Sequence, residues 1–226
     1  MKLRSFSYSA LRMIKNVGWR GHLHLDVRRQ IIAFHAAQAG ESAVFVCGDS
    51  RVEAARLPCE ILGIPVVNAG IGSATVRLVE SEIKKFAGSA QCLVVCVGVN
   101  DAKTASKTSH SVMNFADAIS QACSSLAPDN GRLVLATIPP VEAGKPLGVG
   151  YYDPELITHF NGVIRNLCKE LKFVLADTAV ELADSKGNLR EGLSVDGVHL
   201  QPEAYVLWLR VIVQAIESSV HSAMST

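Results

Sequence analysis

The segment Ala43-Val44-Phe45-Val46-Cys47-Gly48-Asp49-Ser50 combines a short apolar run with a polar turn. Its first five residues carry no charge, which is typical of a parallel strand that is covered on both faces. Gly48 and Asp49 are turn-forming residues, so we expect the strand to end there. Ser50 then lies at the carboxyl end of a strand, where open α/β sheets bind their ligands. This one segment predicts both a class of sheet and a candidate reactive serine.

The same pattern of apolar run and helical segment recurs along the rest of the chain. Four further runs are rich in aliphatic residues and predict strands: Pro65–Asn68, Cys92–Val97, Leu133–Thr137 and Phe173–Ala176. Between and after them lie segments that predict helices: Ala74–Phe86, Val112–Leu126, Pro154–Leu171 and Pro202–Val220. This alternation predicts an α/β fold, a three-layer αβα sandwich around a five-stranded parallel sheet. We expect the flavodoxin-like strand order 2-1-3-4-5.

The first 40 residues do not fit this repeat. Val27–Gln38 predicts a helix with a solvated basic face, so we expect residues 1–40 to form an N-terminal helical extension and residues 41–226 the catalytic domain. No apolar core or cleavage site of a signal peptide follows the basic residues near the N-terminus, which are Lys2, Arg4, Arg12 and Lys15. We therefore expect a cytoplasmic protein.

The composition limits the classes of partner. The chain has 226 residues, 49% hydrophobic and 19% charged, which suits one globular core. A formal charge of +1 gives no basic face for nucleic acid, and no apolar run is long enough for a membrane span. Cys92 and Cys96 lack the further cysteines or histidines of a zinc site, so we expect no metal and no cofactor. The oligomeric state stays open.

A second polar segment, Asp196-Gly197-Val198-His199, precedes the last predicted helix. A serine hydroxyl is a weak nucleophile unless a base within hydrogen-bond reach removes its proton, and histidine is the usual base. An aspartate three residues before that histidine can hold the imidazole in the required tautomer. We therefore predict Ser50 as nucleophile, His199 as general base and Asp196 as the residue that orients it.

Two further segments follow predicted strands and carry hydrogen-bond donors. A glycine-rich turn at residues 68–75 opens a helix, and Gly98-Val99-Asn100-Asp101 follows the third strand. Acyl transfer needs N–H groups that face the oxygen of the tetrahedral intermediate, and both backbone amides and an asparagine side chain can supply them. These donors would converge with Ser50 at one edge of the sheet.

The four segments together resemble those of the SGNH hydrolases, also called GDSL-type esterases and lipases. The resemblance runs from Ala43 to about Tyr205 and implies an SGNH hydrolase-like fold. It implies that Ser50 is the nucleophile and supplies one oxyanion donor through its own N–H, that Asn100 supplies another, and that Asp196 and His199 complete the triad.

The chain departs from the family pattern in two places. Arg51 stands where leucine usually follows the nucleophile, and Ser73, preceded by Gly72, stands at the usual position of a glycine whose N–H is the second oxyanion donor. Gly72 and Ser73 therefore both remain candidates for that donor.

Candidate substrate contacts are Arg51, Tyr151, Tyr152 and the irregular loop Pro139–Asp153, whose length favours a binding role. Arg51 has the alternative of pairing with Glu53 or Glu60 on the surface. Asp49 could contact the substrate and Asp101 could order the site. Alternatively, each could only cap the helical segment that follows it. The remaining histidines, which we expect to be surface or packing residues, are His22, His24, His35, His110, His159 and His221.

The sequence thus predicts a hydrolase that cleaves a small-molecule ester, thioester or acetylated sugar through an acyl-enzyme on Ser50. An acyltransferase with the same triad is the close alternative, and acyl chain length and leaving group stay open. Nucleotide binding at Gly70-Ile71-Gly72 is a distant alternative, because Thr75 replaces the third glycine of a dinucleotide fingerprint. A noncatalytic module is equally distant, since neither Ser50 nor His199 is lost.

Overall fold

The computed structural model describes residues 19–128 and 132–224. Its six-stranded sheet has the spatial order β2-β3-β1-β4-β5-β6. The strands are β1 (Val44–Gly48), β2 (Glu60–Ile61), β3 (Ile64–Gly70), β4 (Cys92–Cys96), β5 (Arg132–Ala136) and β6 (Val174–Ala176). Five of them are parallel, and their order matches the flavodoxin-like order predicted from the sequence.

The expected number of five strands is wrong because of β2, which has two residues and pairs antiparallel with β3. Leu62 and Gly63 lie between the two strands with φ values of 53° and 76°. Positive φ at both central residues gives the tight hairpin turn that adds β2 at the sheet edge. A strand of two residues shows no periodicity, so the sequence pattern could not reveal it.

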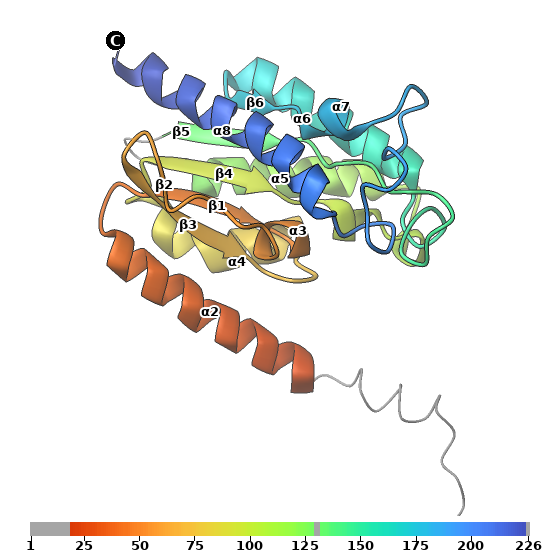
Figure 1. The fold of residues 1–226 in the computed structure, drawn as a ribbon, viewed down its shortest axis with the longest axis horizontal. Helices are drawn as coiled ribbons and strands as arrows, with labels where there is room; N and C mark the ends of the chain where they lie inside the picture. Colours follow the sequence, from red (N-terminus) through yellow and green to blue (C-terminus); the bar gives the residue numbers. More distant parts are fainter. Residues whose placement is uncertain (1–18, 129–131, 225–226) are drawn as a thin grey trace, which may run out of the picture.

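The two faces of the sheet are covered by different helices, which gives the three expected layers (Figure 1). Phe45 and Cys47 point to the face covered by α2 (Trp19–Ala39), α4 (Val76–Ala87), α5 (Ser111–Leu126) and α6 (Pro154–Leu171). Val44 and Val46 point to the face covered by α3 (Ser50–Glu53), α7 (Thr178–Leu182) and α8 (Pro202–Met224). Alternate side chains of one strand thus enter separate cores, as the uncharged strand pattern predicts.

Helix α2 is longer than the predicted helix Val27–Gln38 and packs against β3. Ile32 is 2% exposed and belongs to the same core as Phe45. Arg29 forms an ion pair with Glu82 of α4, which fastens the middle of α2 to the α/β body. The predicted basic N-terminal residues lie outside the described residues. Among the described helices, none is both long enough and apolar enough to cross a membrane.

The strand ends that carry the polar segments lie level with one another. Gly48 of β1 pairs with Gly70 of β3 on one side and with Cys96 of β4 on the other. Parallel strands in this register deliver the segments that follow them to one edge of the sheet. The turn after β3, the 3₁₀ helix η1 (Val99–Ala102) after β4 and the start of α3 therefore meet in space.

Candidate active site

Ser50 is the first residue of α3, directly after the cap residue Asp49. The Asp49 carboxylate accepts a hydrogen bond from the Arg51 N–H at 2.9 Å, which satisfies one free amide of the first helical turn. Asp49 is 3% exposed, and burial raises the pKa of its carboxyl group above the ordinary value. Asp49 therefore caps α3, which is the alternative role considered from the sequence. The cap fixes the turn that carries Ser50.

Three predicted residues form a continuous chain of hydrogen bonds. The Ser50 Oγ lies 3.0 Å from His199 Nε2, and His199 Nδ1 lies 2.7 Å from Asp196 Oδ2. The other carboxylate oxygen of Asp196 accepts the backbone N–H groups of Val198 and His199. Burial alone would raise the pKa of Asp196, but these hydrogen bonds outweigh it and lower the pKa below its usual value. The ionised carboxylate can thus hold Nδ1 protonated and leave Nε2 free to accept the serine proton.

The turn that carries His199 is held by Glu142, which sequence reasoning missed. Glu142 is 5% exposed, and its carboxylate accepts hydrogen bonds from the Gly192 N–H and from Ser194. The Ser194 Oγ in turn accepts the N–H of Gly197. Gly197 has φ of +113°, and a Cβ there would lie 2.4 Å from Gly148 N, so only glycine fits. Glu142 and its partners are about 50 positions apart, so no local pattern could have indicated this contact.

Arg51 lies inside the protein, which corrects both interpretations made from the sequence. Its side chain donates to the carbonyl oxygens of Val198, Pro139 and Pro140 at 2.9, 2.8 and 3.3 Å. The residue is 3% exposed, so it neither reaches toward substrate nor pairs with Glu53 or Glu60 on the surface. It instead ties the nucleophile turn to the histidine turn and to the loop at 139–153.

Asn100 lies in η1 and is 7% exposed. Its Nδ2 donates one hydrogen bond to Ala74 O at 3.0 Å, and its Oδ1 accepts the Tyr152 hydroxyl at 3.4 Å. An amide carries two N–H groups, so the second remains for another acceptor. Burial raises the pKa of Tyr152 to about 12, which keeps its hydroxyl protonated as a donor. Tyr152 is 5% exposed and contacts Asn100, whereas its predicted companion Tyr151 is 46% exposed.

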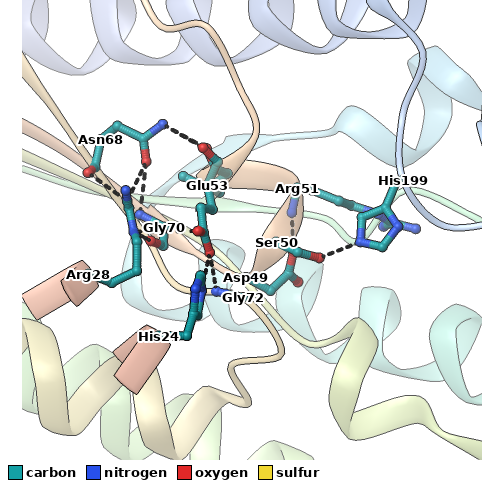
Figure 2. A network of polar contacts seen from close by, with 11 residues as sticks. His24, Arg28, Asp49, Ser50, Arg51, Glu53, Asn68, Gly70, Gly72 and His199 are labelled. Atoms are coloured by element: carbon teal, nitrogen blue, oxygen red, sulfur yellow. Dashed lines mark hydrogen bonds and ion pairs between the residues drawn. The ribbon is translucent and has the colours of Figure 1, made fainter. Parts of the chain in front are cut away.

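The glycine-rich turn distinguishes the two candidates for the second oxyanion donor. The N–H of Gly72 already donates to the carboxylate of Glu53 (Figure 2). Ser73 is exposed and has φ of 62°, and its N–H has no acceptor among the described residues. The Glu53 carboxylate also argues against the nucleotide alternative, because it already occupies the Gly72 N–H that a bound phosphate would use. The geometry therefore favours Ser73 over Gly72 as the free donor.

Asp101, in η1, supports the same turn. Its carboxylate accepts the N–H of Val76, the first residue of α4, at 3.2 Å. It thus caps the helix that follows the glycine-rich turn rather than the segment that follows it in sequence. Burial raises the pKa of Asp101 to about 6. No group of three or more candidate metal ligands occurs in the part of the chain that the structure describes.

The model of the GDSL-like lipase/acylhydrolase family matches residues 18–207. This chain belongs to that family. It is an enzyme of the GDSL/SGNH type, a serine hydrolase that acts on ester bonds. No match is found among curated proteins.

Several solved structures share the fold at low sequence identity. A protein from Streptococcus pneumonia, provisionally described as a platelet activating factor, has a TM-score of 0.72 at 19% identity, over 93% of this chain and 100% of that one. A GDSL-like lipase from Bacteroides thetaiotaomicron has a TM-score of 0.66 at 19% identity, over 84% and 97%. A variant of an acetyl xylan esterase from Geobacillus stearothermophilus has a TM-score of 0.60 at 18% identity, over 79% and 95%. These likenesses support the α/β fold.

Proposed function

We propose that this GDSL hydrolase cleaves a carboxylic ester through an acyl-enzyme on Ser50. The observation that carries the proposal is the hydrogen-bond chain from Ser50 Oγ through His199 to Asp196, with distances of 3.0 and 2.7 Å. His199 Nε2 takes the serine proton as Oγ attacks the ester carbonyl carbon, and it returns that proton to the departing alkoxide. Water, deprotonated by the same nitrogen, then attacks the acyl-enzyme and releases the acid and Ser50.

The proposed oxyanion donors are the N–H groups of Ser50 and Ser73 and the side-chain amide of Asn100. Ser50 N–H is the first amide of α3, and neither it nor Ser73 N–H has an acceptor in the described protein. The second Nδ2 hydrogen of Asn100 is likewise available after the bond to Ala74. Donors already fixed in place stabilise the negative oxygen of the tetrahedral intermediate without reorganising during the reaction.

The substrate class proposed is a small ester, with thioesters and acetylated sugars as members of the test set. One structural neighbour is an acetyl xylan esterase, which makes acetylated sugars a sensible first choice. Transfer of the acyl group to an alcohol other than water would use the same triad. Product analysis with and without an added alcohol acceptor separates the two, because transfer yields a new ester in place of the free acid.

The experiment is covalent labelling of Ser50 combined with a substrate panel. A fluorophosphonate should attach to Ser50 in the unaltered protein, and peptide mass spectrometry locates the label. Ser50→Ala should lose both the label and turnover of p-nitrophenyl esters and acetylated sugars. Ser106→Ala, which removes another serine hydroxyl from the 3₁₀ helix η2 (Thr104–Ser106), should retain both. A label on any other residue, or full turnover in Ser50→Ala, contradicts the mechanism.

A further inference from the structure

A polar network joins α2 to the turn that carries the proposed second oxyanion donor (Figure 2). The Glu53 carboxylate, at the end of α3, accepts the N–H of Gly72. Two side chains of α2 approach the same carboxylate: His24 Nε2 lies 3.2 Å from Oε2, and Arg28 Nε lies 3.8 Å from Oε1. His24, expected to be a surface or packing residue, therefore belongs to this network.

Arg28 also binds the end of β3 directly. Its Nε donates to Gly70 O at 2.9 Å, and its Nη2 approaches Asn68 O at 3.4 Å. The Asn68 amide donates to Val52 O at 2.8 Å, which ties the same strand end to α3. A Cβ on Gly70 would lie 2.1 Å from the N of Glu53, so glycine permits this close approach of the two backbones.

We propose that Glu53 is a positioning residue of the oxyanion hole and that Arg28 of α2 holds it in place. This inference rests on the proposed function of Ser50 and Ser73. Ser73 adopts a φ of 62°, a left-handed conformation that is unfavourable for a non-glycine residue. The bond from the preceding Gly72 N–H to a carboxylate is charge-assisted and strong enough to hold the turn in that shape. The Ser73 N–H then stays without an acceptor in the described protein and is available to the oxyanion.

The charge of Glu53 explains why α2 takes part. A carboxylate close to a developing oxyanion opposes it unless a cation lies nearby. The side chain of Arg28 is 12% exposed and that of Glu53 is 22% exposed, so this pair is only partly screened by water. Arg28 thus lets Glu53 hold Gly72 while offsetting its charge. His24, with 49% of its side chain exposed, contributes less.

The first test compares Glu53→Ala with Glu53→Gln. Alanine removes the acceptor for the Gly72 N–H, so kcat and the rate of Ser50 labelling by a fluorophosphonate should fall about 10- to 100-fold, with KM changed less than about threefold. Glutamine keeps an oxygen acceptor and should retain both rates within about fivefold. If Glu53 has a purely structural role, Glu53→Ala should lower the melting temperature without lowering kcat more than it changes KM.

The matched control uses adjacent residues of α2. Arg28→Ala breaks the contacts to Glu53 and Gly70, whereas Arg29→Ala breaks the ion pair with Glu82 of α4, away from the turn. Arg28→Ala should slow Ser50 labelling about 10-fold, and Arg29→Ala should leave it within about twofold, at similar melting temperatures. Equal labelling rates in the two variants would overturn the role of Arg28.

The labelling rate also separates failure of this inference from failure of the proposed function. If Ser50 is labelled in the unaltered protein and equally fast in Glu53→Ala, the proposed mechanism stands and Glu53 has no positioning role. If the unaltered protein is not labelled at Ser50, the proposed function is wrong, and the role of Glu53 in an oxyanion hole is overturned with it.

Discussion

The side chain of Arg51 donates a hydrogen bond from Nε to the carbonyl oxygen of Val198, which lies 2.9 Å away in space and 147 positions away in sequence. Arg51 follows the proposed nucleophile Ser50, and Val198 precedes the proposed base His199. One buried guanidinium therefore connects the backbones that carry the two reacting groups. The same group also binds Pro139 O and Pro140 O, so the loop at 139–153 is part of this connection.

We expect Arg51→Leu to lower both stability and kcat, although leucine is the residue that the family usually has at this position. Leucine would leave three carbonyl oxygens without a donor, and each unsatisfied buried group costs about 1–3 kcal/mol. Denaturant unfolding and ester turnover measure the two effects. Arg51→Lys keeps the charge but lacks the planar guanidinium. Its stability and kcat should therefore lie between those of the unaltered protein and those of Arg51→Leu. Unchanged unfolding in Arg51→Leu would show that the three bonds do not stabilise the fold.

Substitutions in the proposed triad should lower kcat to different degrees. Ser50→Ala and His199→Ala should each lower kcat by about 10⁶, whereas Asp196→Asn should lower it by about 10⁴. The smaller effect is expected because Asp196 orients His199 and does not itself receive the serine proton. Its backbone contacts to Val198 and His199 could also persist through the asparagine carbonyl. An Asp196→Asn variant as inactive as Ser50→Ala would require a larger role for Asp196.

Asn100→Ala should lower kcat by about 10²–10³ with little change in KM, because its free N–H is proposed to meet charge that exists in the transition state. Asn100→Asp should be worse, since a carboxylate would repel the oxyanion. If Asn100 only shapes the turn through its bond to Ala74, its variants should instead lose melting temperature and keep kcat. Steady-state kinetics and thermal unfolding of both variants distinguish these roles.

The partly buried carboxyl of Asp101 should make stability depend on pH. Its pKa in the folded protein is about 6, above the value of about 3.9 expected in the unfolded chain. Between these two values the folded protein binds a proton that the unfolded chain has lost. The free energy of unfolding should therefore fall as pH rises, by up to about 1.4 kcal/mol per pH unit.

Asp101→Asn removes this titration and keeps an oxygen that can accept the Val76 N–H. Relative to the unaltered protein, the variant should become more stable as the pH rises from about 4 to 6. Urea unfolding of both proteins at several pH values measures the difference, and the titration of Asp49 is common to both. A difference that does not vary with pH contradicts the raised pKa.

Local chemistry along the chain was enough to predict the main architecture. The uncharged runs that begin at residues 43 and 92 form strands that are buried on both faces. Such a run is typical of a parallel strand covered by helices on both sides. Pro154 begins α6 where its missing N–H costs nothing, and the predicted bounds of that helix match the structure. Ser50, Asn100, Asp196 and His199 could be proposed because each follows a recognisable turn or strand end.

Other features depend on contacts between segments far apart in sequence, and only the tertiary structure decided them. Arg51 looked like a surface or substrate residue because its three carbonyl partners come from other turns. The choice between Gly72 and Ser73 depends on Glu53, and the position of Glu53 depends on Arg28 in a helix outside the repeat. Sequence patterns report which residues suit a strand, helix or turn, whereas hydrogen-bond partners are set by how the packed elements bring distant backbones together.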